Sequence, residues 1–200
     1  MSETNNLNNI FISGWGGYKE LLPGIAEKTN FYVPFIDPPE IIKDSIKRGG
    51  KTLMGWSTGA HILSKEIPEN TDKWENIVLI APFSDFTKSF GTKILDAMIK
   101  GLHYNFYKTM NLFYQRCGIK KQIDAKENDA GKLITGLEFL KTSRLVKNSN
   151  SGKITVIYGT NDQIVKKKEI FHLLKIFNNS HFTEVDQPHF INEDILSEFL

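Results

Sequence analysis

The chain has 200 residues, of which 40% are hydrophobic and 24% charged, and its formal net charge at pH 7 is +2. This length is typical of one domain with a sizeable core, and no apolar run reaches the roughly 18 residues of a membrane-spanning helix. The weak net charge argues against a nucleic-acid ligand, while the polar N-terminus and the single Cys117, expected to pack in the core, favour a cytoplasmic protein without disulfides.

Short apolar runs alternate with helical patterns along most of the chain. Such runs are typical of strands buried on both faces of a parallel sheet, and helices connect such strands. We therefore predict an α/β fold with a mostly parallel sheet and helices on both faces. The six expected strands span residues 9–13, 31–36, 52–56, 77–81, 154–158 and 181–185. The expected helices span residues 17–28, 39–48, 58–66, 165–177 and 191–199.

The segment from about residue 85 to residue 150 interrupts this alternation. It has no strand pattern, and its apolar residues between Ile94 and Phe113 recur at helical spacing. One helix of that length would be long for this domain, so we expect a break at Gly101 and a second helix over residues 129–146. We interpret the segment as a helical cap inserted into a single domain of residues 1–200. Additional core helices are the alternative.

Residues 55–59 read Gly-Trp-Ser-Thr-Gly, directly after the third expected strand and directly before a helical pattern. This Gly-x-Ser-x-Gly pattern is typical of a turn so sharp that larger side chains two residues either side of the serine would clash. The turn presents the serine hydroxyl at a helix N-terminus, which favours developing negative charge. The pattern predicts an α/β-hydrolase fold with Ser57 as nucleophile; an ordinary strand-to-helix turn is the alternative.

A serine nucleophile needs a base, and the base needs a group that orients it. In this fold the acid and then the histidine follow the serine along the chain. Asp162 comes just after the fifth expected strand and His189 just after the sixth, so we predict them to be the acid and the base. A helix N-cap is the alternative role for Asp162, and Asp186 is a rival acid. The less favoured bases are His61, His103, His172 and His181.

Acyl transfer also needs two N–H donors for the oxyanion that forms. The backbone N–H groups of Thr58 and of Trp15, in the Gly-rich loop of residues 13–17, are the candidates. A Gly-rich turn with a core tryptophan is the alternative. The side chains of Trp15, Trp56 and Phe83 are expected to line the substrate pocket. We expect no cofactor and no metal, because the sequence has no cluster of residues with metal-ligand spacing.

Five stretches carry a further signal, namely residues 14–16, 55–59, 136–142, 159–162 and 188–190. On these residues the chain resembles the pimeloyl-acyl carrier protein methyl ester esterases of biotin synthesis. The resemblance implies removal of a methyl ester from a pimeloyl chain on an acyl carrier protein, with Ser57, Asp162 and His189 as triad. It also implies that the N–H groups of Trp15 and Thr58 form the oxyanion hole. The chain departs from the family in its missing N-terminal strands and in an abbreviated segment after Phe35.

The charge of the chain is unevenly distributed. Residues 85–150 hold 12 Lys/Arg and 6 Asp/Glu, a net of +6, and the remaining 13 and 17 give −4. In the resembled family the cap meets an acidic carrier, and a basic cap would raise the rate of that association. The candidate docking residues are Arg116, Lys120, Lys121, Arg144 and Lys147, with solvated helix faces as the alternative.

These observations predict a monomeric serine carboxylesterase that acts on a carrier-bound acyl ester. A carboxylesterase or thioesterase for small free substrates is the first alternative, because it would use the same residues. A non-catalytic protein of the same fold that binds a ligand is the second alternative.

Overall fold

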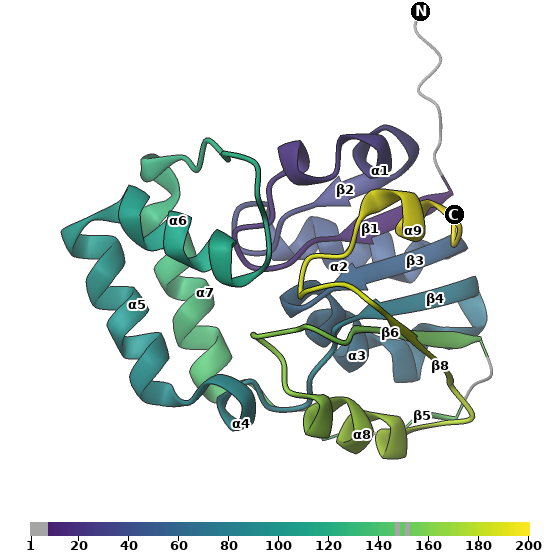
Figure 1. The fold of residues 1–200 in the computed structure, drawn as a ribbon. Coiled ribbons are helices and arrows are strands. Elements are labelled where there is room, and N and C mark those ends of the chain that lie inside the picture. The colour runs from purple at the N-terminus through teal and green to yellow at the C-terminus, as the bar shows by residue number, and fades with distance from the viewer. Residues whose placement is uncertain (1–7, 147–148, 151–152) are drawn as a thin grey trace, which may run out of the picture.

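A computed structural model describes residues 8–146, 149–150 and 153–200 (Figure 1). Within these residues, six strands form one parallel sheet in the order β2-β1-β3-β4-β6-β8, which confirms the predicted mostly parallel sheet. Successive strands are added on one side of β1 and then on the other, so the order switches between β1 and β3. The strands are β1 (Asn9–Ile12), β2 (Asn30–Tyr32), β3 (Gly50–Trp56), β4 (Trp74–Ile80), β6 (Ile154–Gly159) and β8 (His181–Val185).

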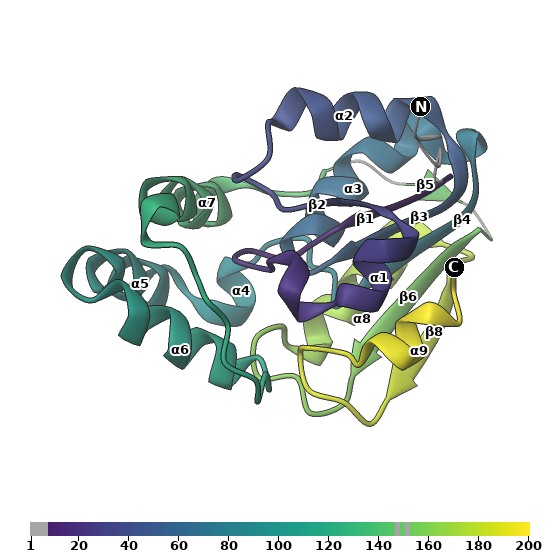
Figure 2. The same ribbon diagram turned by 90° about the horizontal axis from the view of Figure 1, so that it is seen from above.

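Helices cover both faces of the sheet. Figure 2 shows α2 (Pro39–Arg48) and α3 (Thr58–Asn70) on one face, and α1 (Pro23–Lys28) and α9 (Glu193–Ser197) on the other. The side chains of the central strands are therefore enclosed from both sides, and Phe11, Leu53 and Ile77 are fully buried. This burial explains why these strands are continuously apolar in sequence.

Two of the predicted elements are shorter than expected for local chemical reasons. The strand predicted over residues 31–36 ends at Tyr32, because Pro34 has no N–H and Phe35 has a positive φ of 69°. The helix predicted over residues 17–28 is divided into the 3₁₀ turn η1 (Lys19–Leu21) and α1. The division falls at Leu22, whose φ of −134° is not helical.

Helix α2 spans its predicted residues, and the other helices predicted around the sheet differ from the structure only at their ends. The 3₁₀ turn η2 (Thr71–Lys73) follows α3, which runs past its predicted end to Asn70. Helix α8 (Lys167–Ile176) packs against β6 and is followed by the two-residue strand β7 (Phe177–Asn178). Strand β7 pairs with β5 (Ser149–Asn150), a short strand that the sequence did not predict in the segment of residues 85–150.

The segment after β4 is helical, as predicted, and lies beyond the carboxyl ends of the strands (Figure 1). We call its helices α4 to α7 the helical insertion. Within the described ranges, no helix is both long and apolar enough to span a membrane. The elements are α4 (Thr87–Phe90), α5 (Thr92–Tyr104), α6 (Phe106–Arg116), the 3₁₀ turn η3 (Glu127–Asp129) and α7 (Ala130–Thr142).

The break in the first long helical stretch falls at Asn105, so the prediction of a break at Gly101 was wrong. Asn105 has an extended backbone (φ −153°, ψ 91°), and its side chain accepts a hydrogen bond from the Lys108 N–H at 3.0 Å, as an N-cap does. Gly101 instead lies inside α5, where a β-carbon would collide with Thr109 of α6. The glycine thus allows α5 and α6 to approach each other closely.

The second long helix also ends earlier than predicted, at Thr142 instead of residue 146. Ser143 has an extended backbone (φ −71°, ψ 131°), and the Leu145 N–H donates to the Ser84 carbonyl oxygen at 3.0 Å. The two connections of the helical insertion, residues 81–86 and 143–146, are therefore hydrogen-bonded to each other.

We predict that Asn105→Ala lowers the free energy of unfolding by about 1 kcal/mol, because the first turn of α6 loses its cap. In thermal unfolding this corresponds to a midpoint lower by about 2–4 °C for a chain of this size. Asn105→Asp keeps the acceptor oxygen and should stay close to the wild type. An equal loss of stability in both variants would show that the cap is not the source of the effect.

Candidate active site

The turn between β3 and α3 holds Ser57 in a strained backbone conformation. Its φ of 53° and ψ of −111° lie outside the regions that side-chain-bearing residues favour. Its N–H donates to the carbonyl oxygen of Ile80 on β4 at 2.8 Å. A β-carbon on Gly59 would overlap the carbonyl oxygens of Ile12 and Ser13, and one on Gly55 would lie 2.9 Å from the backbone of α3. Both glycines of the motif are therefore required by backbone packing.

Ser57, His189 and Asp162 form one hydrogen-bonded chain. His189 Nε2 lies 3.0 Å from Ser57 Oγ, and His189 Nδ1 lies 2.8 Å from Asp162 Oδ2. The side chains of His189 and Asp162 are almost fully buried. The acceptor-only carboxylate oxygen requires the hydrogen on Nδ1, which leaves Nε2 of the neutral ring free to accept the Ser57 proton. The structure thus brings together the three residues that the sequence analysis predicted to be nucleophile, acid and base.

The two oxygens of Asp162 have separate partners. Oδ2 faces His189, whereas Oδ1 accepts the N–H groups of Ile164 and Val165 at 2.7 and 2.9 Å. The residue is not the N-cap of α8, which begins after Lys166. The rival acid Asp186 is directed elsewhere: its carboxylate accepts from the side chain of Asn161 at 2.8 Å in an exposed turn.

The loop that carries His189 is held from three directions. The indole Nε1–H of Trp56 donates to the His189 carbonyl oxygen at 3.0 Å. The Phe190 N–H donates at 2.9 Å to the carbonyl of Cys117, the C-cap residue of α6. A β-carbon on Gly118 would overlap Pro188, so the α6 end and this loop are in tight contact. Burial raises the pKa of the Cys117 thiol, consistent with its predicted packing role.

Trp15 and Thr58, the residues predicted to supply the oxyanion donors, line the same cavity as Ser57. Thr58 is the first residue of α3, so its N–H has no acceptor within the helix. Trp15 follows β1 in a turn closed by the Gly17 N–H on the Gly14 carbonyl at 3.0 Å, a turn that does not use the Trp15 N–H. The positive φ of 64° at the third turn position, Gly16, is typical of a type II turn.

A narrow apolar cavity lies directly above Ser57, with room for about one water molecule. Trp15 lines it, as predicted, and its indole Nε1–H is fixed by the Leu133 carbonyl at 2.8 Å. Trp56 and Phe83, which the sequence also placed in the pocket, lie elsewhere: Trp56 packs against the His189 loop, and Phe83 is stacked on His61. The other lining residues are Thr58, Phe86, Phe90, Leu95, Met98, Phe113, Leu137, Leu140 and Ile164.

Most of these cavity residues come from the helical insertion and were missed in the sequence. Helical spacing predicts that Leu95, Met98 and Phe113 share a buried face, but it does not say what that face covers. Among the described residues, no cluster of three or more His, Cys, Asp and Glu side chains is placed to hold a metal ion.

The predicted docking residues lie in different surroundings. The Arg116 guanidinium lies 5.3 Å from the ring centre of Phe90, at the edge of the cavity, and Lys120 is exposed. Lys121 donates to the carbonyl oxygens of Glu20 and Leu21 at 2.5 and 2.8 Å. Arg144 is held within the protein: its Nε lies 2.8 Å from Asp85 Oδ2. Lys147 lies outside the described residues.

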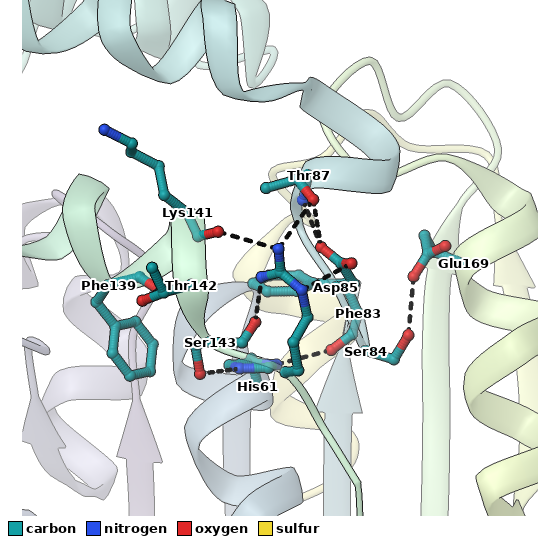
Figure 3. Close-up of polar contacts among 11 residues, drawn as sticks. His61, Phe83, Ser84, Asp85, Thr87, Phe139, Lys141, Thr142, Ser143 and Glu169 are labelled. Carbon is teal, nitrogen blue, oxygen red and sulfur yellow. Dashed lines mark hydrogen bonds and ion pairs between the residues drawn. The ribbon is translucent and has the colours of Figure 1, made fainter.

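Of the other histidines, His61 alone among the described residues is buried, whereas His103, His172 and His181 are exposed. The His61 ring lies one helical turn after Ser57 and contacts the Phe83 carbonyl oxygen through Nδ1 at 2.9 Å (Figure 3). Burial lowers its pKa from 6.5 to about 4, although the Phe83 carbonyl partly opposes this effect. His61 is therefore neutral at physiological pH.

Three comparisons with known proteins bear on this arrangement. No family model and no curated protein sequence matches the chain. Its structure is similar to an esterase, EaEST, from Exiguobacterium antarcticum, with 14% identity over 96% of this chain and 88% of that chain and a TM-score of 0.72.

Two further solved structures agree. MGS-M2, an alpha/beta hydrolase enzyme from a Medee basin deep-sea metagenome library, is 12% identical over 100% of this chain and 88% of that chain, with a TM-score of 0.69. BioG from Haemophilus influenzae is 15% identical over 92% and 88%, with a TM-score of 0.60. These likenesses establish the α/β-hydrolase fold that the nucleophile motif predicted.

The lowered pKa of His61 predicts a pH-dependent stability. Between pH 6.5 and 4 the unfolded chain binds a proton at this residue that the folded chain does not, so stability falls as the pH falls. The contribution of this residue to the loss is about 3 kcal/mol over that range. Urea unfolding of the wild type and of His61→Gln, measured across this pH range, isolates the contribution of His61, because all other groups titrate in both proteins. Parallel curves for the two proteins would contradict the prediction.

Proposed function

We propose that the protein is a serine carboxylesterase that works through an acyl-enzyme. The observation that carries the proposal is the buried chain from Ser57 Oγ through the His189 imidazole to the Asp162 carboxylate. A hydroxyl within 3.0 Å of a neutral imidazole nitrogen can lose its proton as it attacks a carbonyl carbon. The α/β-hydrolase fold supports the same chemistry by analogy.

The proposed reaction has two halves. Ser57 Oγ attacks the ester carbonyl carbon while His189 Nε2 takes its proton, and the N–H groups of Trp15 and Thr58 stabilise the oxyanion. The C–O bond to the alcohol then breaks, and His189 gives its proton to the leaving oxygen. In the second half His189 takes a proton from water, whose oxygen attacks the acyl carbon. His189 then returns the proton to Ser57 Oγ as the acid leaves.

Asp162 has the supporting part in this reaction. It keeps the hydrogen on Nδ1 of His189 and stabilises the imidazolium that forms in each half. The two N–H groups of residues 164 and 165 hold the carboxylate in place, so its second oxygen cannot rotate away from the ring.

For the substrate we propose the methyl ester of a pimeloyl chain on an acyl carrier protein. Two observations support it: the sequence resemblance, and the net charge of +6 on the segment that covers the Ser57 cavity. Arg116 and Lys120 are the docking residues that we retain, because Lys121 and Arg144 already have partners within the protein.

Replacement of the catalytic side chains tests the mechanism. We predict that Ser57→Ala abolishes both hydrolysis of p-nitrophenyl acetate and labelling by a fluorophosphonate probe. Asp162→Asn should lower kcat by about 10⁴-fold, because the imidazole then adopts the wrong tautomer. Asp186→Asn is the matched control and should retain activity, since that carboxylate faces Asn161. Full activity in Ser57→Ala would refute the mechanism, and absence of labelling in the wild type would favour a non-catalytic binding protein.

Salt dependence tests the proposed substrate. We predict that kcat/KM for the carrier-bound methyl ester exceeds that for the same ester without the carrier, and that high salt removes the difference by screening. Arg116→Glu combined with Lys120→Glu should remove the preference at low salt. Lys43→Glu combined with Lys47→Glu, at two exposed positions of α2, is the control for the same change of net charge. If the carrier-bound and the free ester are hydrolysed at equal rates, and Ser57→Ala loses both activities, the protein is a general esterase and the proposed substrate is refuted.

A further inference from the structure

His61 contacts both connections of the helical insertion from the nucleophile helix. Its Nδ1 lies 2.9 Å from the carbonyl oxygen of Phe83 in the first connection. Its Nε2 lies 2.8 Å from Ser143 Oγ in the second. Figure 3 shows the ring between these two partners. His61 lies one helical turn after Ser57. The first turn of α3 therefore holds both the nucleophile and the two connections of the helical insertion.

The directions of these hydrogen bonds follow from their partners. A carbonyl oxygen only accepts, so the hydrogen of the neutral imidazole is on Nδ1 and is donated to Phe83. Nε2 is then an acceptor and receives the Ser143 O–H. Lys65 Nζ lies 3.1 Å from Ser143 Oγ and donates to the same hydroxyl oxygen. The hydrogen of the Ser143 hydroxyl therefore stays directed at His61. Each buried polar atom of the ring is satisfied, and the orientation of the ring is fixed.

Arg144 joins the same two connections on the outside of His61. Its Nε pairs with Asp85 Oδ2 at 2.8 Å, and its Nη2 lies 3.3 Å from Thr87 Oγ1, both near the first connection. The guanidinium also donates to the carbonyl oxygens of Lys141 and Ser143, at 3.0 and 2.8 Å. The guanidinium thus crosslinks the start and the end of the helical insertion.

Two walls of the Ser57 cavity adjoin these contacts. Phe86 comes three residues after Phe83, and Leu140 comes three residues before Ser143; both line the cavity. We propose that His61 is a positioning residue that, by holding both connections against α3, sets the width of the Ser57 cavity and hence the acyl-chain length that the site accepts. The proposal rests on the proposed ester hydrolysis and names what sets its chain-length preference.

The test removes the second contact of His61 and measures chain-length preference. Ser143→Ala leaves Nε2 without a donor, whereas Ser143→Thr keeps the hydroxyl. We expect the ratio of kcat/KM for p-nitrophenyl octanoate to that for p-nitrophenyl acetate to rise at least about fivefold in Ser143→Ala. We expect Ser143→Thr to restore it. The matched control is Ser64→Ala, which removes a buried hydroxyl of α3 whose hydrogen bond, among the residues that the structure describes, is to the Ala60 carbonyl of its own helix.

A second readout does not depend on activity. Amide hydrogen exchange in α5 and α7 should be faster in Ser143→Ala than in the wild type and unchanged in Ser64→Ala. In the wild type, the imidazole ¹⁵N spectrum should show the hydrogen of His61 on Nδ1. A hydrogen on Nε2 would overturn the inferred bond directions.

The outcomes separate the two proposals. An unchanged substrate ratio in Ser143→Ala, with or without faster amide exchange, would overturn the role of His61 in chain-length preference, while labelling of Ser57 would keep the esterase. A substrate ratio that changes as much in Ser64→Ala as in Ser143→Ala would also overturn the positioning role, because general destabilisation would then explain the change. If the wild type hydrolyses neither ester and is not labelled, the proposed function fails. In that case, unchanged amide exchange in Ser143→Ala would also overturn the holding role of the contact between His61 and Ser143. Faster exchange would support this contact as a structural link.

Discussion

The site depends on one unfavourable backbone conformation, that of Ser57. Holding a residue with a side chain at a φ of 53° and ψ of −111° costs about 1–3 kcal/mol. The hydrogen bond from its N–H to Ile80 returns about 1 kcal/mol, so one contact does not offset the strain. The rest comes from the tight packing of β1, β3 and α3, which the two flanking glycines permit. The conformation therefore exists only when the whole centre of the sheet is formed.

The buried polar groups around this turn illustrate a second constraint. His189 and His61 are both enclosed, yet each ring nitrogen has a partner of the opposite hydrogen-bonding type. An unsatisfied nitrogen in either place would cost about 1–3 kcal/mol, comparable to the strain at Ser57. The two rings differ in what they face: His189 faces a carboxylate and a nucleophile, and His61 faces a carbonyl and a serine that holds the helical insertion.

The sequence predicts what depends on local pattern and chain order. The parallel sheet follows from short apolar runs, and the grouping of Ser57, Asp162 and His189 follows from where each stands after its strand. The failures concern which partners a side chain meets from distant parts of the chain. Trp56 and Phe83 were expected to line the substrate pocket, but Trp56 supports the His189 loop and Phe83 packs on His61. Charge alone likewise could not show that Arg144 pairs with Asp85.

The contact between the end of α6 and the His189 loop couples two parts of the protein that the sequence keeps far apart. Cys117 is the C-cap of α6, and its carbonyl oxygen accepts the Phe190 N–H, while Gly118 abuts Pro188. A displacement of α6 away from the sheet would therefore pull on the Phe190 peptide next to His189 and misalign the His189 imidazole. The position of α6 and the alignment of the His189 imidazole are therefore mechanically linked.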